Sequence, residues 1–83
     1  MKYSFESKAE KEFSRLERPV QLQIKNKLEF YMSRKNPLDF AEHLKDFELG
    51  EYRFRIGDYR ITFDVKNNTA IILKIGHRKD IYR

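Results

Sequence analysis

The chain has 83 residues, no cysteine, 40% apolar residues and a formal net charge of +5. This length predicts one domain over residues 1–83, and the lack of cysteine argues against a small secreted scaffold held by disulfides. No apolar run approaches the roughly 18 residues of a membrane span. We therefore expect a cytoplasmic protein with no membrane partner.

The positive charge is concentrated toward the C-terminus. Residues 1–50 contain ten Lys/Arg and nine Asp/Glu, a net charge of +1, whereas residues 51–83 contain eight and four, a net charge of +4. Such an uneven distribution indicates an anionic partner that binds the last third of the chain.

The N-terminal half predicts a short strand followed by two helices. Apolar and polar residues alternate over Lys2–Glu6, which is typical of a strand. Ser7 and Glu10 fit a capping box at the start of a helix over about residues 8–17. Pro19 suits the first position of a second helix. Asn36-Pro37 ends that helix, and residues 37–50 have no clear period and are expected to connect to the sheet.

From Tyr52 onward the hydrophobic period changes to two, which predicts strands. Gly57-Asp58 is typical of a two-residue hairpin turn, and this turn sets the pairing of the two flanking strands. Arg55 then lies opposite Arg60, and Arg53 opposite Thr62.

Ala70–Gly76 is expected to form the last strand, with Ile71, Leu73 and Ile75 facing the core. This orientation requires a three-residue loop, Asn67-Asn68-Thr69. Thr62 would then face Lys74, and Arg60 would face Gly76.

These elements predict an α+β fold in the order β-α-α-β-β-β, with two N-terminal helices packed on one face of a small, mainly antiparallel sheet. The other face of the sheet is expected to expose five cations: Arg53, Arg55, Arg60, Lys74 and Arg78. Like charges on opposite strands destabilise a sheet, so the pairing of Arg55 with Arg60 favours a function over a purely structural role. The guanidinium fork matches the oxygens of phosphate, and we expect a phosphate-binding site on this face.

Two motifs in this region resemble the RelE/ParE superfamily of type II toxin–antitoxin toxins. They are Tyr-Arg-Phe-Arg-Ile-Gly-Asp-Tyr-Arg at positions 52–60 and Gly-His-Arg-Lys-Asp-Ile-Tyr-Arg at positions 76–83. The resemblance covers nearly the whole chain and favours the RelE-like branch. It implies a toxin that enters the ribosomal A site and cuts messenger RNA without a metal or other cofactor, and a cognate acidic antitoxin as partner.

The resemblance also implies roles for single residues. Arg60, Arg78 and Tyr82 take the catalytic positions, and Arg53 and Arg55 take the RNA-binding positions. Lys74 joins the RNA-binding group because of its place on the same face. Arginines stabilise the charge of the phosphorane, and Tyr82 serves as the general base because nearby cations ease the loss of its proton.

Three alternatives remain open from the sequence. His77 is a second candidate for acid or base chemistry, since imidazole exchanges protons near neutral pH. A ParE-like member would inhibit DNA gyrase and cut no RNA, and a catalytically inactive member would only bind RNA. The sequence has no HExxH-type motif or carboxylate cluster, and we expect no metal site.

Overall fold

The computed structural model of the protein describes residues 1–46 and 48–81. In chain order the elements are β1 (Lys2–Phe5), α1 (Ser7–Ser14), α2 (Arg18–Ser33), the 3₁₀ helix η1 (Pro37–Phe40), β2 (Glu42–His43), β3 (Tyr52–Ile56), β4 (Tyr59–Lys66), β5 (Thr69–His77) and α3 (Arg78–Ile81). No helix in this described part of the chain is long and apolar enough to cross a membrane.

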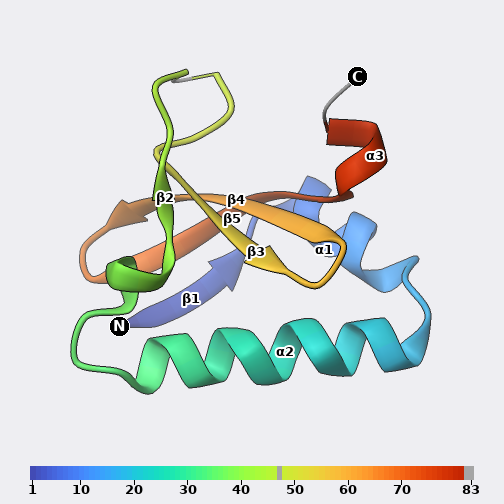
Figure 1. Ribbon diagram of the computed structural model, residues 1–83, viewed down its shortest axis with the longest axis horizontal. Helices are drawn as coiled ribbons and strands as arrows, with labels where there is room; N and C mark the ends of the chain where they lie inside the picture. Colours follow the sequence, from blue (N-terminus) through green and yellow to red (C-terminus); the bar gives the residue numbers. More distant parts are fainter. Residues whose placement is uncertain (47, 82–83) are drawn as a thin grey trace.

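The strands form one sheet in the order β1-β5-β4-β3-β2. β1 runs parallel to β5, and the other neighbouring strands are antiparallel. α2 crosses one face of the sheet, while α3 and the β2–β3 connection rise on the opposite side (Figure 1). The predicted α+β fold with its two N-terminal helices is confirmed, and η1, β2 and α3 are short additions that the sequence pattern did not predict.

α2 begins and ends close to the predicted positions, whereas α1 differs at both ends. It ends at Ser14, before the predicted end near residue 17. Glu6, not Ser7, is the N-cap residue of α1, and no side chain caps the helix. The predicted capping box is therefore wrong, because Ser7 already lies inside the first turn. Pro19 lies in the first turn of α2, where its missing N–H leaves no hydrogen bond unmade.

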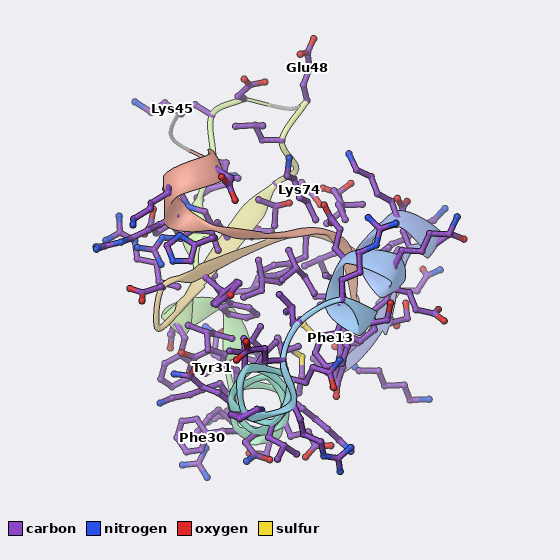
Figure 2. The ribbon with its side chains drawn as sticks, turned by 90° about the vertical axis from the view of Figure 1, so that its right-hand side faces the viewer. Phe13, Phe30, Tyr31, Lys45, Glu48 and Lys74 are labelled. Carbon is purple, nitrogen blue, oxygen red and sulfur yellow. The ribbon has the colours of Figure 1, made fainter. Side chains whose placement is uncertain are left out.

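The core lies between α2 and the sheet. Its fully buried side chains are Ala9, Ile24, Leu28, Phe54, Ile56, Ile61, Phe63, Ala70 and Ile72. Tyr31 stacks on Phe40 and contacts Phe54, and burial raises the pKa of its hydroxyl. In Figure 2, which looks along α2, Lys74 points away from α2 on the far side of the sheet. We call this far side the outer face.

A carboxylate from α1 completes the hydrogen bonding of β5 beyond the end of β1. β1 pairs with β5 only from Thr69 to Ile72. Farther along β5, the backbone N–H of Ile75 donates a 3.0 Å hydrogen bond to Glu12 Oε1. A buried N–H without an acceptor is costly, so Glu12 takes over the role of a neighbouring strand.

The β4–β5 hairpin differs from the prediction in its turn. Lys66 pairs with Thr69, so the loop contains only Asn67 and Asn68, both with positive φ. A β-bulge then shifts the register between Thr62 and Phe63 and leaves Leu73 without a partner. Past the bulge, the predicted pairs of Thr62 with Lys74 and of Arg60 with Gly76 are confirmed.

The bulge also reverses part of the predicted core. Ile72 is fully buried, whereas Ile71 and Leu73 are only partly buried. The expectation that Ile71 and Leu73 face the core is wrong, because the extra residue of the bulge changes the alternation once along β5. Ile75, after the bulge, is buried as predicted.

Candidate functional site

The outer face carries two rows of side chains that run across three strands. Arg55, Arg60 and Gly76 lie opposite one another in the row nearer to the Gly57-Asp58 turn. Arg53, Thr62 and Lys74 form the next row. The hairpin register predicted from the sequence is thus confirmed, and it brings Arg53, Arg55, Arg60 and Lys74 to one face.

Arg60 lies at the centre of this face and is buried, with 7% of its surface exposed. The expectation that all five cations are exposed is wrong for Arg60, near which the short helix α3 packs against β4 and β5. It is also wrong for Arg53, whose side chain is only 13% exposed. Arg60 Nη1 donates 3.0 Å hydrogen bonds to the carbonyl oxygens of Gly57 and Tyr59. Its Nε has no hydrogen-bond partner, and no carboxylate of the described residues lies within 4 Å of its guanidinium.

Glu42 of β2 bridges the two arginines of β3. Arg53 Nη2 donates a 2.7 Å hydrogen bond to Glu42 Oε2, and Arg55 Nε contacts Glu42 Oε1. The hydrogen bond from Arg53, together with the positive charges of both arginines, lowers the pKa of Glu42. The carboxylate therefore balances Arg55, which would otherwise face Arg60 with no counter-charge.

The Gly57-Asp58 turn positions Arg78 at the edge of the site. The backbone N–H of Arg78 donates a 2.8 Å hydrogen bond to the carbonyl oxygen of Asp58. The Arg78 Nε and the Asp58 carboxylate lie 3.7 Å apart, and both side chains are more than half exposed. Arg78 thus lies beside the same turn that holds Arg60.

The two candidates for proton transfer have different outcomes. Tyr82 lies outside the described residues. His77 is the last residue of β5, and its ring contacts Tyr59 edge-on at 5.4 Å between centroids. The backbone N–H of Lys79 donates a hydrogen bond to His77 Nδ1, so Nδ1 is the acceptor nitrogen and the neutral ring carries its N–H on Nε2.

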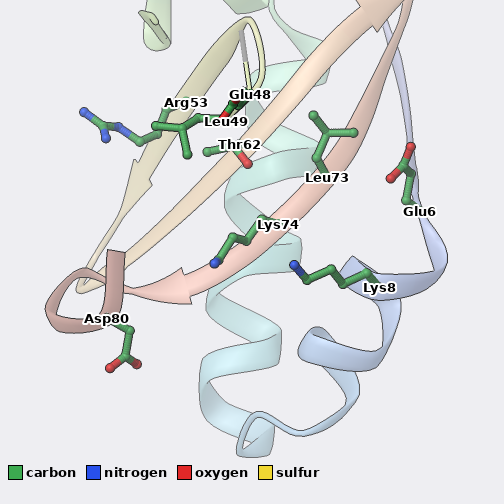
Figure 3. A pocket seen from close by; sticks show the side chains of 9 residues that line it. All are labelled: Glu6, Lys8, Glu48, Leu49, Arg53, Thr62, Leu73, Lys74 and Asp80. Atoms are coloured by element: carbon green, nitrogen blue, oxygen red, sulfur yellow. The ribbon is translucent and has the colours of Figure 1, made fainter. Parts of the chain in front are cut away.

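A pocket of about 480 Å³ opens on the outer face beside the second row (Figure 3). Its lining residues are Glu6, Lys8, Glu48, Leu49, Arg53, Thr62, Leu73, Lys74 and Asp80. They come from the start of α1, the β2–β3 connection, all three central strands and α3. In Figure 3 the side chains of Lys8 and Lys74 extend in the same direction across the view.

This arrangement suits an anion more than a metal ion. The described residues contain no group of three or more His, Cys, Asp or Glu side chains that could hold a metal. A buried guanidinium is costly unless an anion pairs with it. Among the described residues Arg60 has only carbonyl acceptors, so a phosphate or another oxyanion is the group that best completes its surroundings.

Comparison with known proteins identifies the family. Residues 3–82 match the family described as the ParE toxin of the type II toxin–antitoxin system parDE. The chain belongs to this toxin family, within the RelE/ParE superfamily. The superfamily resemblance inferred from the two motifs is confirmed.

The similar proteins are RelE toxins. Toxin RelE3 of Methanocaldococcus jannaschii is 48% identical over 31 residues, and the match spans 37% of this chain and about a third (35%) of that toxin. The RelB–RelE antitoxin–toxin complex of Methanococcus jannaschii has 27% identity and a TM-score of 0.72, over 94% of this chain and 93% of that one.

Two further structures support the fold. The RelBE2 toxin–antitoxin complex of Mycobacterium tuberculosis has a TM-score of 0.79 at 23% identity, over 93% of this chain and 96% of that one. The intact RelBE complex of Escherichia coli has a TM-score of 0.68 at 20% identity, over 92% of this chain and 94% of that one.

Glu42 is the site residue that the sequence pattern did not indicate. It lies in a strand of two residues, too short to show a period of two, inside a segment expected to be irregular. Its position beside the strand of alternating arginines becomes clear only from the pairing of Glu42 with Arg53.

Proposed function

We propose that this toxin is an endoribonuclease that cuts messenger RNA in the ribosomal A site without a metal or cofactor. The observation that carries the proposal is Arg60, a buried guanidinium with no carboxylate among the described residues and an Nε that has no partner. The residue opposite Arg60 in this row is Gly76, which has no side chain. A phosphate of the RNA backbone binds on this side of Arg60 in the proposed complex.

The proposed reaction uses the RNA's own 2′-hydroxyl as nucleophile. Its oxygen forms a bond to the adjacent phosphorus and the bond to the 5′ oxygen breaks, which gives a 2′,3′-cyclic phosphate and a 5′-hydroxyl. Arg60 and Arg78 stabilise the negative charge of the phosphorane and cannot lose their own protons. Tyr82 takes the proton of the 2′-hydroxyl, and the leaving 5′ oxygen gains a proton from the solvent. His77 is the alternative base, and in that role its Nδ1 must first release the hydrogen bond from Lys79.

Arg53, Arg55 and Lys74 hold the RNA backbone on either side of the scissile phosphate. Lys74 is exposed and has no carboxylate within 4 Å among the described residues. Arg53 and Arg55 already share Glu42, so RNA competes with this carboxylate for the two guanidinium groups. We propose that Glu42 keeps the two side chains extended along β3 until RNA arrives.

We also propose that the toxin is cytoplasmic and that its partner is a cognate antitoxin rich in Asp and Glu. The similar structures are toxin–antitoxin complexes by their descriptions. The net charge of +4 over residues 51–83 favours an acidic partner segment.

A gyrase-inhibiting toxin is the second candidate, since the matching family is described by its ParE member. Such a toxin would act through a protein interface and would not require a buried cation for phosphate. Catalytically inactive RNA binding is a third outcome.

Induced expression followed by mapping of messenger RNA ends separates these functions. The proposal expects cuts inside translated frames, lost with Arg78→Ala and Tyr82→Phe. Intact transcripts together with failing DNA supercoiling would favour the gyrase function. Full activity of Tyr82→Phe combined with loss of activity in His77→Gln would reverse the assignment of the base.

A further inference from the structure

The pocket on the outer face differs in charge from the arginine row beside it. Its lining includes three cations (Lys8, Arg53 and Lys74) and three carboxylates (Glu6, Glu48 and Asp80). Arg55, Arg60 and Arg78 do not line it. A volume of about 480 Å³ lies within the range of small-ligand sites. A charge-balanced pocket beside a cationic site favours a neutral polar group next to a phosphate.

The bulge in β5 supplies an apolar floor for this pocket. Leu73, which a regular strand would place opposite a partner, has none and lines the pocket instead. Gly50 allows the β2–β3 connection to approach closely, because a Cβ at Gly50 would lie 3.1 Å from Leu73 Cδ1. Leu49, next to Gly50, lines the pocket with 47% of its surface exposed. Two leucines are thus available for the faces of a planar ring.

The pocket also contains a polar atom without a partner. Thr62 is 4% exposed, and its Oγ1 has no hydrogen-bond partner among the described residues. A buried hydroxyl without a partner is unfavourable. Thr62 lies on β4 two residues from Arg60, on the same face and in the neighbouring row. The distance along the strand is about 7 Å, which a single nucleotide can span.

We propose that this pocket binds the nucleobase of the nucleotide whose phosphate contacts Arg60. The assignment rests on the proposed function and adds a base subsite to it. The leucines contact the ring faces, and Thr62 Oγ1 bonds to the ring edge after a rotation of its side chain. The carboxylates accept hydrogen bonds from exocyclic amino groups. Adenine, guanine and cytosine carry such groups and uracil does not, so the pocket discriminates against uracil.

Titration of ¹⁵N-labelled protein with nucleoside 5′-monophosphates tests the subsite separately from cleavage. Ribose 5-phosphate, which lacks a base, is the reference probe. It should shift the amide signals of Arg60 and Arg78 but leave those of Leu49, Thr62 and Leu73 unchanged. AMP, GMP and CMP should shift both groups and bind at least threefold more tightly than UMP and ribose 5-phosphate.

Two pairs of variants assign the effect to the pocket. Leu49→Asn should weaken the binding of AMP, GMP and CMP to the affinity of ribose 5-phosphate. Leu22→Asn should leave their binding unchanged, although Leu22 on α2 is similarly exposed, at 45%. Thr62→Val should raise the melting temperature and reduce base-dependent binding. Thr69→Val is the matched control, because Thr69 lies on β5 outside the pocket, and this variant should leave nucleotide binding unchanged.

Equal affinity for all five probes, with no shifts at Leu49, Thr62 and Leu73, would overturn the base subsite while the shifts at Arg60 and Arg78 still support the phosphate site. Failure of ribose 5-phosphate and of all nucleotides to shift Arg60 and Arg78 would overturn the phosphate site itself. Unchanged nucleotide binding in both Leu49→Asn and Thr62→Val would also overturn the subsite.

Discussion

Glu42 forms an ion pair with Arg55 from the neighbouring strand, and the same carboxylate accepts a hydrogen bond from Arg53. Across the sheet Arg55 lies directly opposite Arg60. The edge strand β2 therefore supplies the one counter-charge of this row that the described residues provide. Loss of that charge should affect both the stability of the fold and the repulsion between the two opposed arginines.

The stability contributed by Glu42 should disappear at acid pH. Its pKa is lowered from an ordinary value of 4.5, first by the hydrogen bond from Arg53 and then by the charges of both arginines. A lowered folded-state pKa gives stability that is present above the unfolded-state pKa and lost as the pH falls through the folded-state pKa. Glu42 is partly exposed, so the effect should reach no more than about 1 kcal/mol.

The measurement is the difference in unfolding free energy between the parent and Glu42→Gln, from urea denaturation across the acid range. The parent should be more stable at neutral pH, and the difference should close below the ordinary carboxyl range of about pH 4. Glu10→Gln, on the exposed side of α1, should show no such closing difference. A difference that grows toward acid pH would mean that the pKa of Glu42 is raised in the folded protein and not lowered.

A double-mutant cycle should show that Glu42 is coupled to Arg55 through their ion pair. Glu42→Gln should cost stability while Arg55 is present. In an Arg55→Thr background the same change should cost less, because the ion pair is already gone and only the hydrogen bond from Arg53 is lost. We expect a coupling free energy of about 0.3–1 kcal/mol. Additive effects would mean that the ion pair between Glu42 and Arg55 contributes no measurable stability to the folded protein.

Replacing Arg60 should separate stability from function. Arg60→Met keeps an unbranched apolar side chain and removes a buried cation that has no carboxylate among the described residues. Such replacements are often neutral or stabilising, so the variant should melt at least as high as the parent in chloride. RNA cleavage should fall by about 100-fold or more, the usual cost of removing one group that stabilises the transition state.

A thermal-shift series in phosphate and in chloride at equal ionic strength checks the binding half of this prediction. Phosphate should stabilise the parent more than Arg60→Met. Arg15→Met, at the C-cap of α1, controls for the loss of one positive charge. An equal response of parent and Arg60→Met to phosphate would remove Arg60 from the anion site.

Hydrophobic period and turn chemistry were sufficient to predict the centre of the sheet. Gly57-Asp58 fixes the register of β3 and β4, and that register alone placed Arg53, Arg55 and Arg60 on one face. The role of Glu42 was not predicted because a two-residue strand has no measurable period. The burial of Arg60 was not predicted because α3 is a single turn that follows directly on β5. Both features depend on contacts between distant segments.

Glu12 offers a test of one such distant contact. Its carboxylate accepts a hydrogen bond from the backbone N–H of Ile75 on β5. Glu12→Ala should leave this N–H without an acceptor and cost about 1–3 kcal/mol. Glu10→Ala, two residues earlier on α1 and exposed, should cost much less. Amide hydrogen exchange gives a local readout, since Ile75 should exchange faster in Glu12→Ala but not in Glu10→Ala.

The β4–β5 turn provides the last prediction, because a two-residue loop together with the pairing of Thr62 with Lys74 requires a bulge between them. Asn67 and Asn68 have φ values of 51° and 57°, and two positive values in a two-residue loop are typical of the hairpin turn that prefers Asn-Gly. Asn68→Gly should therefore stabilise the protein by a few tenths of a kcal/mol, while Asn68→Ala should destabilise it by about 1 kcal/mol. A three-residue loop that included Thr69 would make these two substitutions alike, and it would return Leu73 to the core. Equal melting temperatures for the two variants would thus contradict the turn and the bulge together, and with the bulge the apolar floor of the proposed base subsite.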